Sequence, residues 1–435
     1  MLKRKATDQL KHWVDHRDKK CLVVQGARQT GKTYMIERFA EDNYEEVVEI
    51  NFKETASAKA IFEGDLTVDH MIMAFRFRFP DKKIAPGKTL IFLDEIQECE
   101  EAITSLKFWA IDNRYDVIVS GSLLGIDYKR ASSYPVGYVD YLKMYGLDFE
   151  EYLWGAGITE EMLNMLKACL AQKQPVPTSI NDQMFRYYRQ YIATGGMPEA
   201  VQKYFDTQDY REVDTIQRNL LQGYLYDIAH YATAEEKVKA EKCYLTLGKQ
   251  LLDKENHKFQ YKEIEKGARA QKYYHSIDWL LRADMVHLSR VVTDVRYDLD
   301  DYARDDFFRA YTTDLSLLVA MKDFSLKQHI VENTLTGNSK GGVYECAVAD
   351  ALYKKGYTLY FYKNETTKKE LDVIIQKDGQ VIPIEVKGGN ASANSIDAIL
   401  KKYDDITCAY KFVDGNIGVS DNGLVTLPLY MVALI

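Results

Sequence analysis

The sequence predicts an α/β fold, and three observations lead to this class. Short apolar runs rich in Val, Ile and Leu alternate with helix-like stretches over the first 155 residues. A glycine-rich segment, GARQTGKT, follows the first of these runs and precedes a helix-like stretch. The last hundred residues return to alternating helix and strand patterns. We therefore expect a P-loop type parallel sheet with helices on both faces, followed by a helical region and a small α/β region.

Length and composition limit the class of protein. The chain has 435 residues, which is too long for one hydrophobic core, and we expect three domains at 1–155, 156–335 and 336–435. Its net charge of −8 gives no overall basic field that would attract nucleic acid or anionic lipid. Six isolated cysteines and the lack of a signal peptide or a long apolar stretch indicate a cytoplasmic protein without a membrane-spanning segment.

Four buried strands are expected in the first domain, and the segment 139–154 could add a fifth. Parallel strands that are buried on both faces form continuous apolar runs rather than alternating ones. The helix-like stretches between the runs fit strand–helix–strand units. The expected strands are CLVVQ at 21–25, VVEINF at 47–52, TLIFL at 89–93 and VIVS at 117–120.

The middle region has a helical pattern from about residue 160 to 290. Polar loops that contain proline interrupt it at 172–179 and 194–200. Residues 240–290 predict a helix, a turn, a second helix and a strand, which is the element order of a winged helix. Winged helices serve in DNA binding and in protein docking, so both kinds of partner stay open.

The glycine-rich segment matches the phosphate-binding pattern G-x-x-x-x-G-K-[ST] between a strand and a helix, as this chemistry needs. Its glycines let the loop curl so that backbone N–H groups and the start of the next helix face a phosphate. The lysine adds a full charge at the β- and γ-phosphates, and the threonine hydroxyl is a ligand for Mg²⁺. We expect ATP and Mg²⁺ at Gly26, Ala27, Arg28, Gln29, Thr30, Gly31, Lys32 and Thr33.

Two acidic residues follow the run TLIFL, at the strand end where phosphoryl transfer needs carboxylates. Asp94 can hold the metal together with Thr33, and Glu95 can orient or deprotonate the attacking water. Ser120 or Ser122, which end the run VIVS or follow it, would face the γ-phosphate or this water. Together with the upstream loop, the acidic pair predicts ATP hydrolysis.

These motifs form a collinear set with YPVGYVDYLKMYGLDFEEYL, TGGMPEAV and the terminal segments ELDVIIQ and IPIEVKGG. The set resembles bacterial and archaeal AAA+-type ATPases that carry a C-terminal DUF4143 region. The resemblance covers nearly the whole chain. It implies an AAA+-like core, a helical, winged-helix-like middle and a C-terminal domain similar to PD-(D/E)XK nucleases.

One position departs from that family. Members usually have a basic residue after the glycine of the segment YPVGY, where this chain has Tyr138. A basic side chain there could sense the nucleotide, and a tyrosine cannot supply the charge. Arg130 is a candidate for a residue that reaches the nucleotide of a neighbouring subunit, although a solvated arginine is the commoner case. ATP binding therefore follows from the loop, whereas hydrolysis stays open.

The C-terminal region holds a second group of candidates. Glu385 and Lys387 lie two residues apart, so they project from the same face of one strand, and Asp372 begins the strand before it. Two carboxylates and a lysine suit Mg²⁺-dependent phosphodiester cleavage, but the same spacing is common on amphipathic hairpins. The PD-(D/E)XK resemblance adds a helical glutamate, and Glu345 stands at the matching place.

Three functions are compatible with the sequence. The first is a Mg²⁺-dependent AAA+-like ATPase that couples its nucleotide state to the regions that follow, with DNA as one target. The second is an ATP-gated, metal-dependent nuclease. The third is a nucleotide switch that docks a protein partner without hydrolysing ATP. A homo-oligomer is compatible with each, because AAA+-like cores usually act as assemblies.

Overall fold

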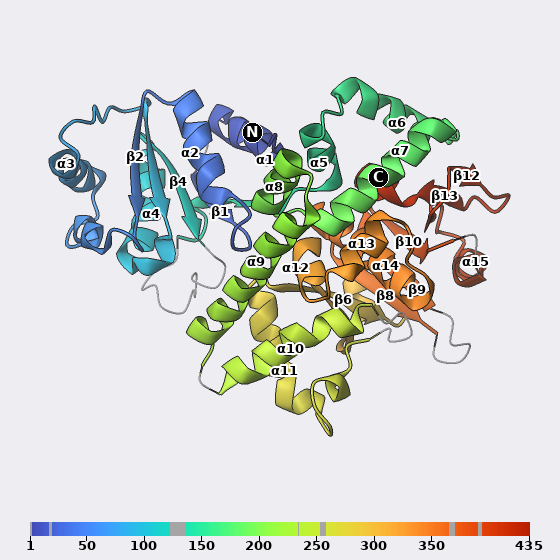
Figure 1. The fold of residues 1–435 in the computed structure, drawn as a ribbon. Coiled ribbons are helices and arrows are strands. Elements are labelled where there is room, and N and C mark those ends of the chain that lie inside the picture. The colour runs from blue at the N-terminus through green and yellow to red at the C-terminus, as the bar shows by residue number, and fades with distance from the viewer. Residues whose placement is uncertain are drawn as a thin grey trace. The chain divides into compact units, whose positions relative to one another are not determined.

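The computed structural model shows two compact units, each with its own sheet (Figure 1). The first, which we call the N-unit, comprises Lys3–Tyr145 and Arg282–Asp284. The second, the C-unit, comprises Met1–Leu2, Gly146–Leu281 and Met285–Ile435. The structure describes residues 2–16, 20–121, 135–233, 235–252, 258–364, 370–389 and 394–435.

The N-unit contains a five-stranded parallel sheet in the order β2-β3-β4-β1-β5. Its strands are β1 (Cys21–Gln25), β2 (Glu46–Asn51), β3 (Thr89–Asp94), β4 (Asp116–Gly121) and β5 (Val139–Lys143). The four expected strands are confirmed within one or two residues. The segment 139–154 divides into β5 and helix α5 (Phe149–Gly155), because a capping box between Asp148 and Glu151 starts a helix there.

Helices cover both faces of the N-unit sheet (Figure 1). Alternate strand residues point to opposite faces, so Leu22 and Val24 of β1 pack with one pair of helices, and Cys21 and Val23 pack with the other. This is why the strands are apolar throughout, and it confirms the predicted fold class. The first pair is α1 (Lys5–Asp15) and α2 (Lys32–Asn43), and the second is α3 (Val68–Arg78) and α4 (Glu100–Asp112). Two short 3-10 helices are η1 (Ala56–Phe62) and η2 (Ile96–Glu98).

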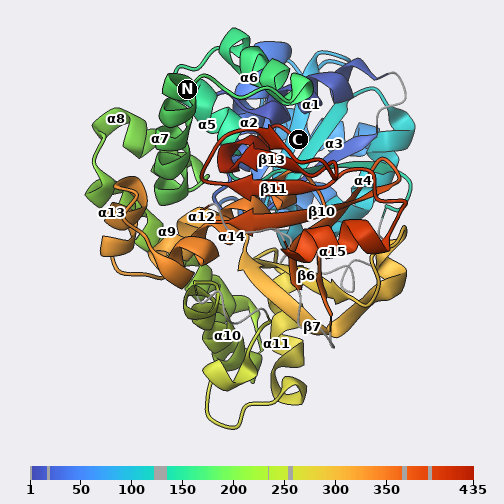
Figure 2. The ribbon, with the colours of Figure 1, turned by 90° about the vertical axis from the view of Figure 1, so that its right-hand side faces the viewer.

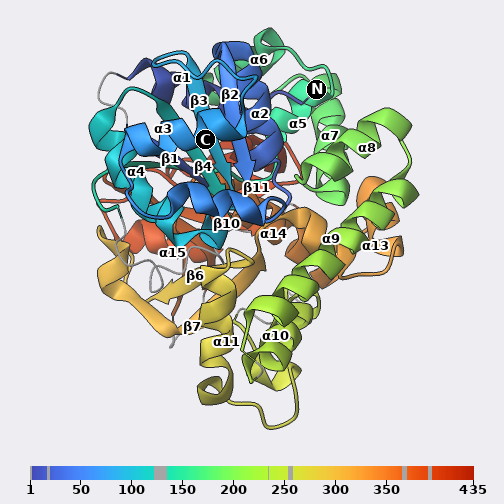
Figure 3. The same ribbon diagram turned by 90° about the vertical axis from the view of Figure 1, so that its left-hand side faces the viewer.

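The first half of the C-unit is helical, as the sequence predicts. Figure 3 shows the long helix α9 beside α10. After α5, the helices are α6 (Glu160–Gln172), α7 (Thr178–Thr194), α8 (Pro198–Thr207), α9 (Tyr210–Tyr231), α10 (Glu236–Gln250), η3 (Tyr261–Glu263) and α11 (Ala270–Arg282). Further along the chain lie η4 (Leu299–Tyr302), α12 (Leu315–Ala320), α13 (Ser325–Val331), α14 (Gly337–Lys354), α15 (Asn394–Lys402) and η5 (Leu429–Ala433).

The C-unit sheet is mixed and has the strand order β12-β13-β11-β10-β9-β8-β6-β7. Figure 2 shows β10, β11 and β13 side by side, with α15 next to them. The strands are β6 (Val286–Val292), β7 (Ala303–Thr312), β8 (Leu359–Lys363), β9 (Glu370–Lys377), β10 (Gln380–Lys387), β11 (Tyr410–Val413), β12 (Gly418–Val419) and β13 (Val425–Pro428). The two C-terminal strands expected around Asp372 and at Glu385 and Lys387 correspond to β9 and β10.

Strand β6 connects the middle region to the last one. It follows α10 and α11, in the element order expected of a winged helix, and forms an antiparallel pair with β7. On its other side β6 pairs in parallel with β8, so residues before and after 335 share one sheet. The winged-helix assignment and the domain limits at 155/156 and 335/336 stay predictions.

Two further observations concern membrane-spanning helices and the cysteines. Within the described ranges, no helix is both long enough and apolar enough to cross a membrane. The six cysteines are free thiols, of which Cys169 and Cys408 are partly exposed and the other four are buried.

Candidate nucleotide-binding site

The glycine-rich loop begins where β1 ends, and its backbone needs glycine at two positions. Gly26 has φ +155°, and a Cβ atom there would collide with the carbonyl oxygen of Met144, next to β5. Gly31 has φ +86° and is the N-cap of α2. Between them, Gln29 also adopts a left-handed conformation with φ 62°. The loop therefore curls back over the start of α2, as the phosphate-binding pattern requires.

Lys32 lies inside this curl. Its Nζ donates hydrogen bonds to the carbonyl oxygens of Gly26 and Ala27, each at 2.9 Å. Burial lowers the pKa of Lys32, while the charges of Glu95 and Asp94 oppose this shift. The ammonium group is thus held at the centre of the loop, close to both predicted acidic residues.

Arg4, which the sequence reasoning missed, supports the loop from outside. Its guanidinium donates to the carbonyl oxygen of Thr30 at 3.1 Å and to that of Tyr145 at 2.6 Å. The Thr30 hydroxyl in turn donates to the carbonyl oxygen of Ala27 at 3.0 Å. Arg4 precedes α1, far from the loop in sequence, and no pattern marks it. Its role becomes visible once α1 packs on the sheet.

Asp94 gathers polar groups from four segments. Its Oδ2 accepts from the Thr33 hydroxyl at 3.1 Å and from Asn51 Nδ2 at 3.0 Å. Its Oδ1 accepts from the Ser120 hydroxyl and from the backbone N–H of Glu95. These four hydrogen bonds fix the orientation of the Asp94 carboxylate. The structure brings Thr33, Asp94 and Ser120 together, and Asn51 could have been found as the last polar residue of the expected strand 47–52.

The oxygen donors at this point suit Mg²⁺. A threonine hydroxyl and a carboxylate are the hard ligands that Mg²⁺ takes beside a nucleotide phosphate, with water completing its shell. Thr33 is the second residue of α2 and Asp94 is the last residue of β3, and the Thr33 hydroxyl lies 3.1 Å from Asp94 Oδ2. Thr33 would bind the ion directly, and Asp94 would hold one of its waters.

Glu95 has an unusual backbone conformation for a residue with a side chain. Its φ is 52°, in the left-handed region, directly after β3. Its carboxylate accepts a hydrogen bond from Gln97 Nε2, and its charge acts on Lys32. Gln97 was not among the predicted site residues, although it follows the acidic pair in LDEIQ.

Three other candidates have different outcomes. Ser122 and Arg130 lie outside the described residues, so their roles stay predictions. Tyr138 is described, and the Lys107 ammonium lies 5.6 Å from the centre of its ring. A cation is therefore present near Tyr138, but it comes from α4 rather than from the position where the resembling family has its basic residue.

The second predicted group lies in the C-unit on α14, β9 and β10. Lys387 Nζ is 2.8 Å from Glu385 Oε1, and the carboxylate of Asp372 accepts from the Val386 N–H at 2.8 Å. Burial opposes the charged form of Lys387, but Glu385, Asp372 and Glu345 outweigh it and raise the lysine's pKa. The structure therefore brings all four predicted residues into one electrostatic cluster.

A buried arginine, which the sequence reasoning missed, completes this cluster. Arg309 of β7 donates to Glu345 Oε1 at 2.6 Å, to Glu370 Oε1 at 2.7 Å and to the carbonyl oxygen of Asp372 at 2.9 Å. Glu345 Oε1 also accepts from the Tyr311 hydroxyl at 3.0 Å. The carboxylate that would complete a metal site is therefore turned to an internal cation.

These contacts bear on the Mg²⁺ that the nuclease resemblance implies. Over the ranges that the structure describes, no group of three or more His, Cys, Asp or Glu residues is placed to hold a metal ion. The guanidinium of Arg309 and the ammonium of Lys387 supply positive charge among the acids instead. The residues do not fit a Mg²⁺ site, and the PD-(D/E)XK assignment stays a prediction.

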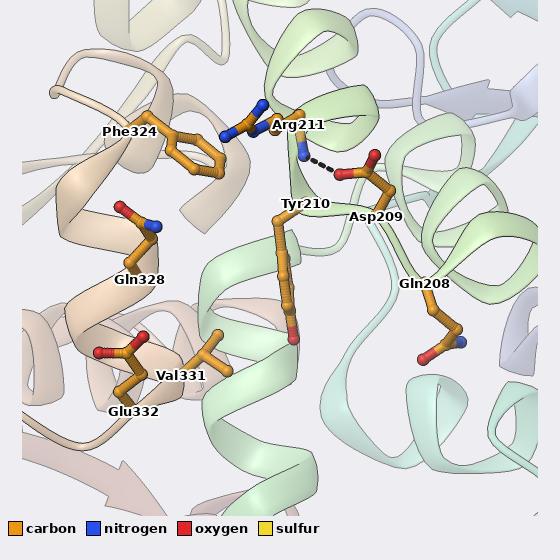
Figure 4. A pocket seen from close by; sticks show the side chains of 8 residues that line it. All are labelled: Gln208, Asp209, Tyr210, Arg211, Phe324, Gln328, Val331 and Glu332. Carbon is orange, nitrogen blue, oxygen red and sulfur yellow. Dashed lines mark hydrogen bonds between the residues drawn. The ribbon is translucent and has the colours of Figure 1, made fainter.

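A separate cavity of about 310 Å³ lies in the C-unit between the α8–α9 turn and α13 (Figure 4). None of the predicted site residues lines it. Its lining residues are Gln208, Asp209, Tyr210, Arg211, Phe324, Gln328, Val331 and Glu332.

Comparison with protein-family models finds three matches along the chain. Residues 18–153 match an AAA domain (AAA_14), residues 185–328 match a domain of unknown function (DUF8612), and residues 340–430 match another (DUF4143). No curated protein matches the chain.

Several solved structures are similar at low scores. AMPPCP-bound DnaA from Aquifex aeolicus has a TM-score of 0.31 at 11% identity, over 64% of this chain and 87% of that chain. The Aeropyrum pernix ORC1 protein in complex with DNA has a TM-score of 0.27 at 13% identity, over 76% and 93%. The S. cerevisiae Hsp104-ADP complex has a TM-score of 0.28 at 12% identity, over 64% and 45%. Likenesses this weak carry no argument about function. The family models, however, confirm the resemblance that the motifs imply, because the N-terminal part of the chain matches an AAA domain and the C-terminal part matches DUF4143.

Proposed function

We propose that the N-unit binds ATP with Mg²⁺ and hydrolyses it, and that the nucleotide state acts on the C-unit. The observation that supports this most strongly is the joining of Thr33, Asp94 and Ser120 by hydrogen bonds at the end of the phosphate loop. Lys32 lies in the electrostatic field of Asp94 and Glu95. The phosphate loop therefore lies close to Asp94, the proposed metal ligand, and to Glu95, the proposed general base.

Each group has a role in phosphoryl transfer. The backbone N–H groups of residues 26–33 and the Lys32 ammonium would hold the β- and γ-phosphates. Bound Mg²⁺ would neutralise charge that develops on the phosphate oxygens. Glu95 would take a proton from the attacking water, while Ser120 and Asn51 keep Asp94 in place. Ser122 stays a candidate beside the γ-phosphate.

Two variants test binding and hydrolysis separately. Lys32→Ala should abolish detectable ATP binding, because it removes the full positive charge of the loop. Glu95→Gln should keep ATP binding and lower turnover by about a hundredfold or more, since general base catalysis contributes about 10²–10⁴-fold. Binding is measured with a fluorescent ATP analogue and turnover by phosphate release.

Matched controls are available on the surface. Lys88→Ala and Glu41→Gln remove exposed charges that form surface ion pairs, and both should leave binding and turnover unchanged. Undetectable turnover of the unchanged protein, with and without DNA, would contradict hydrolysis. ATP binding that survives in Lys32→Ala would contradict the proposed loop.

The target of the nucleotide state is tested in the same assay. The order α10, α11, β6 is compatible with DNA binding and with protein docking, so turnover is measured with and without duplex DNA. Stimulation by DNA supports a DNA target. ATP binding without turnover, combined with partner binding that depends on nucleotide, supports a switch instead. A nuclease is not proposed, because Glu345 pairs with Arg309 and Glu385 pairs with Lys387; Mn²⁺-dependent nicking lost in Asp372→Ala would reverse this.

A further inference from the structure

The side chain of Gln97 lies beside Glu95, the proposed general base, and only the nitrogen of its amide has a hydrogen-bond partner among the described residues. Its Nε2 donates to Glu95 Oε2. An ionised carboxylate has no hydrogen to donate, so the amide nitrogen must face Glu95 and the amide oxygen must face away from it. That oxygen, Oε1, is buried and has no hydrogen-bond partner within the part of the chain that the structure describes. A buried acceptor without a donor costs free energy, so Oε1 is a candidate to accept a hydrogen bond from a bound molecule.

The end of strand β4 leaves space for the Gln97 side chain. Gly121 ends β4, and a Cβ atom at this position would collide with Gln97 Oε1. The residue before it, Ser120, donates to Asp94. The end of β4 therefore contacts the surroundings of both acidic residues. Ser120 donates a hydrogen bond to Asp94, and Gly121 leaves space for Gln97, which donates to Glu95.

The backbone conformation of Glu95 explains how Gln97 reaches the Glu95 carboxylate. Residue 95 has φ 52°, a left-handed conformation that costs energy for a residue with a side chain. The conformation turns the chain from β3 into η2 and brings Gln97 back to the carboxylate that lies two residues before it. The strained turn and the amide contact together fix where the carboxylate points.

We propose that Gln97 is a positioning residue for ATP hydrolysis, which orients Glu95 through Nε2 and accepts a hydrogen bond from the attacking water through Oε1. This inference rests on the proposed function. The water oxygen forms a bond to the γ-phosphorus while the bond from that phosphorus to the β–γ bridging oxygen breaks. One water proton passes to Glu95, and the other stays on the attacking oxygen and is donated in a hydrogen bond to Gln97 Oε1. The products are ADP and inorganic phosphate.

The test separates turnover from binding. Gln97→Met keeps the length of the side chain and removes both amide contacts. We expect kcat to fall by about tenfold to a hundredfold, with the Kd for ATP and the melting temperature unchanged, since an interaction made in the transition state affects kcat alone. The control is Gln202→Met, which changes a half-buried glutamine of α8 that donates a hydrogen bond to Asp206. It should leave all three quantities unchanged.

A second variant gives a readout that a purely structural role would not change. Gln97→Glu has the same shape but places a second carboxylate against Glu95, and such a pair shares a proton more readily as the pH falls. A shared proton restores the hydrogen bond that the amide makes. The kcat of Gln97→Glu relative to the unchanged protein should therefore rise as the pH is lowered from 8 to 6.

The outcomes are distinguishable. Unchanged kcat in a folded Gln97→Met variant overturns the role of Gln97 and leaves the proposed ATPase intact. If Gln97→Met does not fold, a ratio for Gln97→Glu that stays constant with pH overturns it. Absence of turnover in the unchanged protein overturns hydrolysis, and this inference with it.

Discussion

At the scale of single residues, burial decides the charge of the group around Lys354. Its Nζ lies 2.7 Å from Asp314 Oδ2 and 2.9 Å from Asp350 Oδ2, and it donates to the Tyr191 hydroxyl at 3.0 Å. Two buried carboxylates thus share one ammonium. Burial raises the pKa of Asp350 to about 7 against the attraction of Lys354, whereas Lys354 and Ser316 hold the pKa of Asp314 low against burial. Asp350 is therefore the carboxyl that keeps its proton towards neutral pH.

This assignment predicts a pH dependence of stability. An unfolded Asp releases its proton near pH 4, so the folded state binds more protons than the unfolded state between about pH 4 and pH 7. The stability from this group is complete below about pH 4 and is lost as the pH rises through about 7. Asp350→Asn mimics the protonated acid, so it should remove this loss. Urea midpoints from pH 5 to 8.5 measure it.

The control for that experiment is Asp404→Asn, which changes an exposed aspartate. It should keep the pH dependence of the unchanged protein. Equal slopes of the urea midpoint against pH in Asp350→Asn and in the unchanged protein would contradict the assignment.

At the scale of elements, Arg309 joins its own strand to three other elements. It lies on β7 and binds Glu345 of α14 and Glu370 of β9, with its guanidinium 4.6 Å from the centre of the Phe361 ring on β8. Burial disfavours the cation, but Glu345 and the other nearby acids outweigh this and raise the pKa of Arg309. The sequence could not place this residue, because its partners lie on strands and a helix whose pairing only the fold reveals.

Removal of this arginine should destabilise the C-unit strongly. Arg309→Met keeps an apolar stem and leaves two buried carboxylates without their main cation, so we expect a loss of about 3–5 kcal/mol in the free energy of unfolding. Arg304→Met on the same strand removes an exposed pair with Asp306 and should cost about 0–1 kcal/mol. Urea unfolding compares the two. Equal effects would mean that the cluster does not hold the elements together.

At the scale of the whole molecule, the sequence predicts best what is local. The phosphate loop, the acidic pair and the N-unit strands are continuous segments, and each is placed to within a residue or two. Arg4 and Asn51 were missed because their roles depend on contacts between separate segments. Gln97 was missed because the sequence does not show that the backbone turns at Glu95 and brings the amide back to its carboxylate. The pairing of β6 with β8 could not be predicted for the same reason, since neither strand carries a signal for its neighbour.

The shared sheet predicts the behaviour of a shortened chain. A protein that ends after residue 335, at the expected domain limit, keeps β6 and β7 but lacks β8, the parallel partner of β6. The exposed edge of β6 should then favour association between chains, because its N–H and C=O groups lack partners. Size-exclusion chromatography and light scattering compare this fragment with the full chain. A monodisperse fragment with a cooperative unfolding transition would show that the middle region folds alone.

The pairing of β6 with β8 also concerns the time during which the protein is made. The 67 residues from the end of β6 to the start of β8 (359 − 292) must be synthesised before the two strands can meet. At about 5–20 residues per second, this takes about 3 to 13 seconds. The hairpin of β6 and β7 therefore leaves the ribosome well before its partner strand. On a crowded polysome, neighbouring nascent chains present the same open edge during that interval.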